Sequence, residues 1–301
     1  MKGERGALLF MVGVVVIWGV NVSVMKAAVS ELPPLAFNAL RFPLGATALA
    51  LFVWRLEPRP WPEPGEWREL FLLGLVAHPI YQVCFANGLA LTAASHTAVL
   101  VSTTPIFVAL ADHFLGHEHL PRQAWVGILL SVAGVLLLVM ARGGAGETPS
   151  LFGDALVLLG SMLWTIYVIR SRALLRRRSP LWVTAWALFL GTPFVVLMGL
   201  PALARTDFSR LTVAAWGGGV YAGLFALATA YSWWAVGLQR LGASRTAIFS
   251  NLIPVVALAV AWLWLGERLP ALAWAGVATV LAGVWLTSIS RRAVSGAAQP
   301  D

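Results

Sequence analysis

A short stripe of polar and aromatic side chains interrupts an otherwise apolar part of the sequence, at His78, Tyr81, Gln82 and Phe85. In a helix over residues 68–89, Gln82 and Phe85 follow His78 at i+4 and i+7 on one face, and Tyr81 lies close by. Pro79 frees one backbone carbonyl, because proline has no amide hydrogen to donate. The stripe predicts a small-molecule binding surface, with His78 as the candidate for proton coupling because histidine titrates near neutral pH. A bonded core histidine is the alternative.

Other polar and aromatic residues stand in apolar segments and are predicted to line the same surface: Trp18, Asn21, Trp164, Tyr221, Ser250 and Asn251. Aromatic rings bind flat apolar or cationic groups by stacking and cation–π contact. Tryptophan also gathers at membrane interfaces, which accounts better for Trp233 and Trp234 than for Trp18 and Trp164. Arg41 either contacts an anionic ligand or bonds to loop carbonyls near a helix end, and the sequence leaves both readings open.

The elements that must position these residues are apolar helices. The chain has 301 residues, 59% of them hydrophobic and 11% charged, whereas soluble domains carry about 25% charged residues. A spanning helix needs about 20 mostly apolar residues. The run from Gly6 to Met25 is too long for the core of a cleaved signal peptide, so we expect it to be retained. The sequence predicts an all-α integral membrane protein with ten transmembrane helices, at residues 6–26, 35–54, 68–89, 95–115, 123–141, 152–170, 181–200, 212–236, 243–265 and 271–290, with the break before the ninth at Gly242.

Residues 88–137 and 237–286 are two copies of one segment, aligned without a gap at an offset of 149 residues, with seventeen of 50 positions identical. Chance would give roughly one match in ten in so apolar a chain, so the repeat is genuine. The copies begin in the third and eighth helices. These helices are five spans apart, and because five is odd, the two copies cross the membrane in opposite directions. Inverted repeats are typical of transporters. We predict two inverted five-helix repeats around a central cavity, residues 1–142 and 150–292, and a disordered tail, 293–301.

Lysine and arginine are distributed unevenly between the predicted loops. With the N-terminus in the cytoplasm, 15 of them lie on the cytoplasmic side and 5 on the other, and Arg41 lies within a span. Positive charge marks cytoplasmic loops. The sequence therefore predicts a bacterial inner (plasma) membrane protein with both termini in the cytoplasm. The net charge of +8 follows from this asymmetry, so we expect no nucleic-acid partner.

The pattern Gly-Leu-x5-Ser-x-Thr-Ala-x6-Pro, followed by a glutamate, occurs twice, at 88–118 and 237–267. Together with Arg41-Phe42 and Gly153-Asp154 it resembles the EamA module of the drug/metabolite transporter superfamily, and two modules cover essentially the whole chain. The resemblance implies a ten-helix inverted repeat, a central cavity and export of small metabolites or drugs. Similar proteins include exporters of aromatic amino acids and viologen dyes, exporters of cysteine-like amino acids and, more distantly, carriers of sugars and nucleotide-sugars.

Prolines and glutamates recur at matching places in the two copies. Pro105 follows Ser102-Thr103-Thr104, and Pro254 follows Ser250-Asn251. Each proline is predicted to open its helix, and the polar residues either patch the freed backbone or form a flexing point. Glu118 and Glu267 fall beyond the ends of the fourth and ninth helices on opposite faces, as plain loop charges or as gate or helix-capping groups. A further set is predicted to form a close-packing seam: Gly127, Gly134, Gly276 and Gly283.

Catalytic and metal sites are not predicted. His113, His117 and His119 with Glu118 lack the i, i+4 histidine pair around a general base. Neither a Ser-His-Asp set nor a phosphate loop is present, so no cofactor is expected. An intramembrane enzyme would have only His78 and Tyr81 to use, and a channel would need a continuous polar lining.

The sequence thus predicts a secondary transporter, rather than an enzyme, that exports small amphipathic metabolites by alternating access. Amino acids, aromatic or otherwise neutral, are the first choice of substrate; a sugar, nucleotide-sugar or cationic dye is the alternative. The expected partners are the substrate and the lipid bilayer, and the chain is expected to be a monomer or a weak homodimer through the fifth and tenth helices.

Overall fold

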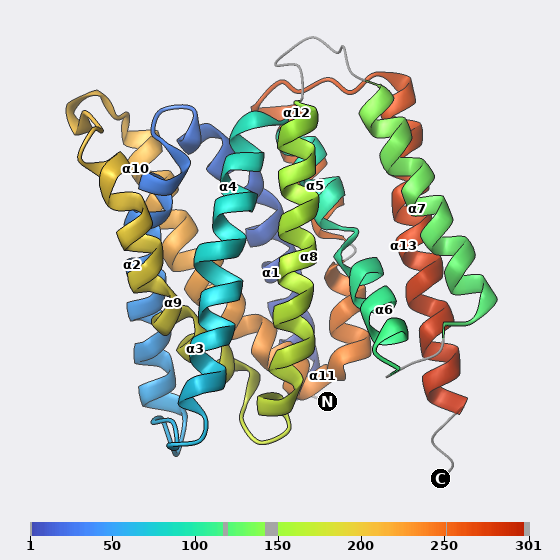
Figure 1. Cartoon of the computed structure of the whole chain (residues 1–301), viewed down its shortest axis with the longest axis horizontal. Coiled ribbons are helices and arrows are strands. Elements are labelled where there is room, and N and C mark those ends of the chain that lie inside the picture. Colours follow the sequence, from blue (N-terminus) through green and yellow to red (C-terminus); the bar gives the residue numbers. More distant parts are fainter. Residues whose placement is uncertain (1, 117–119, 142–149, 251, 298–301) are drawn as a thin grey trace.

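The computed structural model describes residues 2–116, 120–141, 150–250 and 252–297, and side chains within 6–116, 120–141, 150–237, 240–241, 249 and 252–290. These residues form a helical bundle without strands (Figure 1). The first half consists of α1 (Lys2–Val29), α2 (Pro34–Leu56), α3 (Trp67–Leu75), the π-helix η1 (Val76–Ile80), α4 (Tyr81–Leu91), α5 (Ala94–Val101), α6 (Thr104–Phe114) and α7 (Arg122–Met140).

The second half repeats this order. It consists of α8 (Leu151–Leu175), α9 (Pro180–Leu203), the short 3-10 helix η2 (Phe208–Arg210), α10 (Val213–Val220), the π-helix η3 (Tyr221–Thr229), α11 (Ala230–Ser250), α12 (Ile253–Trp264) and α13 (Ala271–Ala297). Nine helical stretches in the described ranges are long and apolar enough to cross a membrane, and Ile253–Trp264 is a shorter apolar helix. The predicted all-α membrane fold is confirmed.

Corresponding helices of the two halves run antiparallel, as α7 and α13 show at the right of Figure 1. The two helices approach so closely at their glycines that a side chain would collide with the opposite backbone. A methyl group on Gly127 would lie 2.7 Å from the carbonyl oxygen of Gly283, and one on Gly134 would lie 2.8 Å from that of Gly276. The contact partner therefore moves backward along α13 as the chain advances along α7. The Ser131 hydroxyl donates to the Val280 carbonyl across the same contact, at 3.2 Å. The predicted glycine seam thus lies between the two halves of one chain.

The two halves interlock. The first helix of the first half, α1, packs against η3, α10, α11 and α12 of the second half. The first helix of the second half, α8, packs in the same way against α4, α5 and α6 of the first half. Each half therefore completes the core of the other, and residues from both meet in the middle of the bundle.

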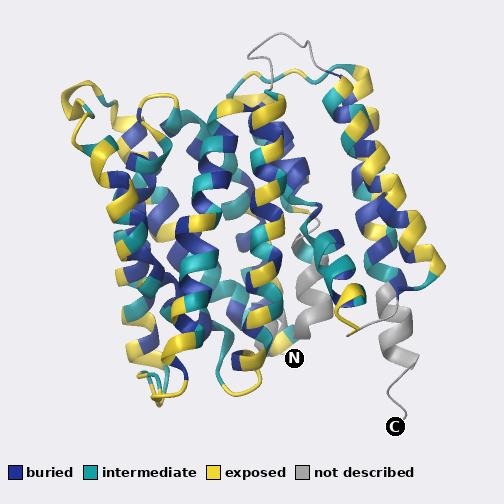
Figure 2. Ribbon diagram, viewed as in Figure 1, coloured by how far each residue is buried: buried dark blue, intermediate teal, exposed yellow. Residues whose placement is uncertain are grey.

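Large apolar side chains cover the outside of the bundle, where yellow alternates with blue along α7 and α8 in Figure 2. Leu9, Leu129 and Leu263 are among the most exposed. Soluble monomers rarely expose large contiguous apolar patches, whereas lipid tails solvate them. The buried positions are rich in alanine and glycine, which let helices approach closely.

The second half differs from the prediction at Gly242. The sequence predicted a break there, but α11 is helical from Ala230 to Ser250. A glycine costs a helix only about 1 kcal/mol relative to alanine, which is too little to end it without a proline. The last helix, α13, extends to Ala297, and residues 298–301 lie outside the described part of the chain.

A bulky residue in the α7–α13 seam is expected to destabilise the protein. Gly134→Val places its branch against the Val280 backbone nitrogen, 2.6 Å from the new Cβ, and overpacking of this kind costs roughly 1–3 kcal/mol. Gly217→Val is the matched control, because it makes the same change inside a helix with no neighbour within 4 Å. Thermal unfolding in detergent should show a clearly lower midpoint for Gly134→Val. Equal midpoints for the two variants would contradict the seam.

Candidate functional site

Two π-helices occupy matching positions in the two halves. In the first half η1 spans Val76–Ile80 and contains His78 and Pro79. The repeat offset of 149 places its counterpart at 225–229, which lies inside η3 (Tyr221–Thr229). π-Helices are rare and occur often at functional sites, because they shift the helix register and leave backbone groups differently bonded. Pro79 signalled the first, whereas η3 contains no proline, and its sequence gave no sign of the second.

His78 is buried between helices. Its side chain packs edge-on against the ring of Phe42, with ring centroids 5.6 Å apart, and a methyl group on Gly191 of α9 would lie 2.9 Å from its Cβ. The residue is 3% exposed, and its Nε2 has no hydrogen-bond partner among the described residues. His78 is thus held by α2 and α9, with one ring nitrogen left free for a bond.

Gln82, one turn further on, bonds to Arg41 of α2. The Arg41 Nη2 donates to the Gln82 Oε1 at 3.1 Å, and Nε donates to the Asn38 Oδ1 at 2.9 Å. The guanidinium also lies over the rings of Phe37 and Phe42, 5.3 and 5.1 Å from their centroids. Arg41 is therefore anchored by helix side chains inside the bundle, rather than by the loop carbonyls that the sequence left open.

A first aromatic cluster, Tyr81, Phe85, Trp164 and Tyr167, joins α4 to α8. Tyr81 stacks on Phe85 with centroids 5.3 Å apart and meets Trp164 at 5.2 Å. Trp164 in turn contacts Tyr167 at 4.8 Å. Two of the predicted site residues, Tyr81 and Trp164, are thus in contact.

A second aromatic cluster, Trp18, Tyr231 and Trp234, joins α1 to α11. The ring of Trp18 lies 5.4 Å from Tyr231 and 5.3 Å from Trp234, and its Nε1 donates to the Ala226 carbonyl of η3 at 3.0 Å. Trp18 and Trp164 hold matching places in the two halves, as do Trp234 and Phe85, so the two clusters share two of their positions. Arg41 bonds to Gln82, the residue that follows Tyr81 of the first cluster.

The remaining predicted site residues are more scattered. The Tyr221 hydroxyl donates to the Ile17 carbonyl at 3.0 Å, and its ring stacks on Phe225. The Asn21 Nδ2 bonds to the Met25 sulfur in its own helix, and its Oδ1 has no described partner. The side chains of Ser250, Asn251 and Glu118 lie outside the described residues.

The fourth predicted span is broken before its proline. α5 ends at Val101, α6 begins at Thr104, and Pro105 is the second residue of α6. The hydroxyls of Ser102, Thr103 and Thr104 donate to the carbonyls of Val99, Leu100 and Val101 at 2.6, 2.6 and 2.7 Å. These side chains therefore patch the interrupted backbone. Pro254 likewise is the second residue of α12.

Glu267 caps a helix of the other half. Its two carboxylate oxygens accept hydrogen bonds from the backbone amides of Ala94 and Ser95, at 2.8 and 2.9 Å. These amides open α5 and have no partner within the helix, and a carboxylate also favours the positive end of the helix dipole. The contact joins the end of α12 to the start of α5 at the upper end of Figure 1; a gating role for Glu267 stays a prediction.

Charged contacts hold α8 at both ends. At its start, Asp154 accepts from the Thr92 hydroxyl at 2.6 Å and lies 3.4 Å from the His96 Nδ1. Near its other end, Arg172 makes a two-pronged ion pair with Asp112 of α6, at 2.6 and 2.9 Å. These pairings could not be predicted from the sequence, because the partners are about 60 residues apart along the chain.

The loop that follows α8 carries a further ion pair. Arg178 donates to both carboxylate oxygens of Glu66, at 2.8 and 2.9 Å, and its guanidinium lies 4.7 Å from the ring of Trp182. These hydrogen bonds lower the pKa of Glu66. In the described residues no group of three or more His, Cys, Asp or Glu side chains is arranged to hold a metal ion.

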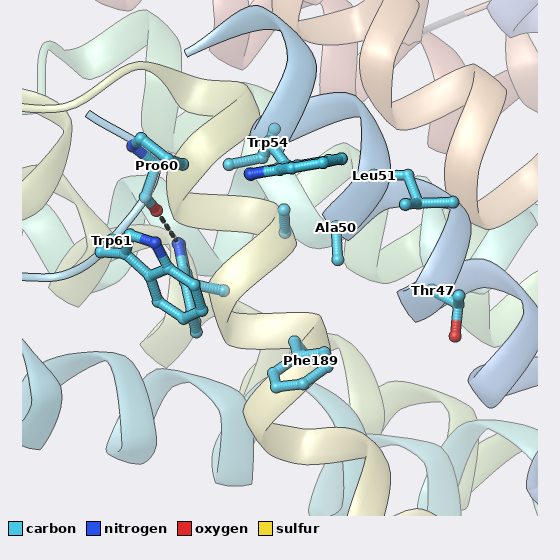
Figure 3. Close-up of a pocket in the computed structure, with 10 residues that line it drawn as sticks. Thr47, Ala50, Leu51, Trp54, Pro60, Trp61 and Phe189 are labelled. Carbon is cyan, nitrogen blue, oxygen red and sulfur yellow. Dashed lines mark hydrogen bonds between the residues drawn. The ribbon is translucent and has the colours of Figure 1, made fainter. Parts of the chain in front are cut away.

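A lateral pocket of about 330 Å³ opens between α2, the following loop and α9 (Figure 3). Its walls are mostly apolar and include the aromatic side chains of Trp54, Trp61, Trp186 and Phe189. The Trp186 Nε1 donates to the Pro60 carbonyl at 2.7 Å. None of the predicted site residues lines this pocket. Its tryptophans lie at a bundle end, as expected for side chains at a membrane–water boundary.

The comparisons with known proteins agree with this architecture. The model of the EamA-like transporter family matches residues 5–140 and 151–289. A Streptantibioticus cattleyicolor protein named "Probable terminal-alkyne amino-acid exporter" is 30% identical over 290 residues, 95% of this chain and 94% of that protein. "Uncharacterized transporter YetK" of Bacillus subtilis is 25% identical over 306 residues, 100% of this chain and 90% of that protein. One crystal structure shares the fold with a TM-score of 0.66 at 18% identity, covering 96% of this chain and 99% of the other.

Removal of the Glu267 carboxylate is expected to loosen the start of α5. Hydrogen bonds to a charged group contribute about 1.5–3 kcal/mol each, so Glu267→Ala should speed hydrogen exchange of peptides covering Ala94–Val101 by tenfold or more. Glu31→Ala is the matched control, because Glu31 makes the same kind of contact with the Thr212 amide, at 2.9 Å, at the start of α10. That variant should loosen α10 and leave α5 unchanged. Unaltered exchange of α5 in Glu267→Ala would refute the capping contact.

Proposed function

The chain belongs to the EamA-like transporter family, and on that premise we propose that it is a secondary transporter that exports amino acids with apolar or aromatic side chains. The observation that carries the substrate class is the pair of corresponding aromatic clusters, around Trp164 and around Trp18, beside the buried polar residues Arg41 and Gln82. Such a site offers stacking faces to an apolar side chain and polar bonds to a backbone-like head group. The relative named as a probable amino-acid exporter supports this choice.

Transport would proceed by alternating access. Each half packs into the other through its first helix, so a rocking motion of the halves moves helices on both sides of the site. The breaks before Pro105 and Pro254 provide places to bend, because backbone hydrogen bonding is already interrupted there. Glu267 at one end and Glu118 at the other would stabilise alternate closed states, and His78 is the group best placed to couple transport to protons.

The charge distribution supports a location in the inner (plasma) membrane with both termini in the cytoplasm. At the lower end of the bundle in Figure 1 α1 begins, and α8 and α13 end. Arg170 and Arg172 belong to the last turns of α8, and Arg178 to the loop that follows it. Basic residues on one side of the spans favour the cytoplasmic side for that end. Export would then move substrate from the lower to the upper end.

A cationic dye is the second candidate substrate. Aromatic rings attract flat cations, and the site contains several of them. The positive charge of Arg41, which bonds to Gln82 beside the first cluster, opposes a cation, so we place amino acids first. A sugar offers the rings no extended apolar group. The base of a nucleotide-sugar can stack on aromatic rings, so the choice of amino acids over nucleotide-sugars rests on the relative named as a probable amino-acid exporter.

Loss of one stacking ring is expected to weaken transport without unfolding the protein. We expect Trp164→Ala and Trp18→Ala in proteoliposomes to raise the KM of counterflow of labelled phenylalanine or leucine about 2–10-fold, since an aromatic contact contributes about 0.5–1.5 kcal/mol beyond its buried area. Trp54→Ala, in the lateral pocket, is the control and should leave the KM unchanged. The absence of saturable counterflow for every amino acid tested, with folded wild-type protein, would contradict the proposed function.

A further inference from the structure

The carboxylates in the described part of the chain are all engaged away from Arg41. Within the bundle, Asp112 pairs with Arg172 and Asp154 with Thr92 and His96. The others lie at helix ends and loops, where they bond to side chains or amides: Glu31, Glu57, Glu63, Glu66, Glu69, Asp207 and Glu267. Arg41 therefore stands without a negative partner among the described residues.

The hydrogen bonds of Arg41 do not neutralise it. A guanidinium has five N–H donors, and the two hydrogen bonds that Arg41 makes go to neutral amide oxygens, from Nε to Asn38 and from Nη2 to Gln82. The side chain is 2% exposed, so it does not extend to water. An unpaired charge inside a membrane protein costs several kcal/mol and marks a functional site unless packing requires it.

The packing does not require an arginine at this place. Two equivalent helix crossings occur in the two halves: Gly45 of α2 against Gly223 of η3, and Gly191 of α9 against Gly74 of α3. A methyl group on Gly223 would lie 2.8 Å from the Arg41 carbonyl oxygen, and one on Gly74 would lie 2.6 Å from that of Ala187. The same close approach thus forms with alanine in one half and arginine in the other.

Further polar groups near Arg41 have no hydrogen-bond partner among the described residues. The Nδ2 of Asn38, whose Oδ1 accepts from Arg41, is fully buried and bonds to no described residue. The Nε2 of His78 is also unpartnered, and the His78 ring packs against Phe42, whose ring lies under the Arg41 guanidinium. A cation flanked by unused polar groups is the chemistry of an anion site.

We propose that Arg41, with Asn38, binds the carboxylate of the transported molecule, so that this site selects substrates by their negative group. The inference rests on the proposed function, because it assigns the head group of the amino acid to Arg41 and the side chain to the adjoining aromatic clusters. The bound carboxylate then neutralises the Arg41 guanidinium for as long as the substrate is in the site. Phosphate and sulfate share this anion chemistry, and the experiment separates them.

The test compares two inhibitors of phenylalanine counterflow in proteoliposomes: phenylalanine itself and phenylalaninamide, which keeps the ring and the amine but lacks the negative charge. Wild-type protein should be inhibited at least tenfold more weakly by the amide. Arg41→Gln should reduce this preference to within about twofold, and Arg41→Lys, which keeps the charge, should retain part of it. The matching Ala187 indicates that Arg41→Ala also folds, and it should behave as Arg41→Gln.

A second measurement separates failure of the inference from failure of the proposed function. Thermal unfolding of the purified protein is followed with phenylalanine, benzoate, phosphate, sulfate and phenethylamine. If counterflow of amino acids fails but an anion still raises the unfolding midpoint of wild-type protein and not of Arg41→Gln, the anion site stands and the amino-acid assignment falls. An equal preference for acid over amide in wild type and Arg41→Gln would overturn the inference. So would the absence of any Arg41-dependent stabilisation by an anion.

Discussion

The structure depends on one constraint: a polar group inside a membrane-spanning bundle must find its partner within the protein, because lipid offers none. In the interrupted fourth span the exposed backbone carbonyls find such partners: three consecutive hydroxyls, from Ser102 to Thr104, donate to the carbonyls of the preceding turn. At the start of α5 the free amides are met by Glu267 of the other half. Trp18 meets a carbonyl of the irregular helix η3. Arg41 is the group for which the described protein supplies hydrogen bonds but no opposite charge.

Inverted symmetry and departures from it have separate roles in this molecule. The features that recur in both halves are mechanical: antiparallel glycine contacts between α7 and α13, close crossings at Gly45 and Gly191, π-helices and proline breaks. The polar residues Arg41, His78 and Gln82 occur in one half and are replaced by Ala187, Leu227 and Tyr231 at the matching places of the other. A scaffold of symmetric crossings thus carries an asymmetric set of polar groups, as transport of an asymmetric molecule requires.

Much of the fold follows from the sequence. The length of each apolar segment is a local feature, and the 149-residue repeat is found by comparing the chain with itself. The spans, the antiparallel halves and the breaks at Pro105 and Pro254 were predictable in this way. Gly242 was misjudged because one glycine is a weak helix breaker. Gln82, which bonds to Arg41, and the partners of Asp112 and Glu267 lie 41 to 173 residues away along the chain, and side-chain pairing at such distances leaves no mark in a single sequence. The sequence therefore identified the polar residues but not their contacts.

The most direct test of this account is an experimental structure of the protein with phenylalanine bound. We predict that the carboxylate oxygens lie about 2.7–2.9 Å from the Arg41 guanidinium, the range of charge-assisted hydrogen bonds, with the ring against one of the two aromatic clusters. A bound substrate whose carboxylate lies elsewhere, with Arg41 still held only by Asn38 and Gln82, would contradict the claim that the substrate supplies the missing counter-charge.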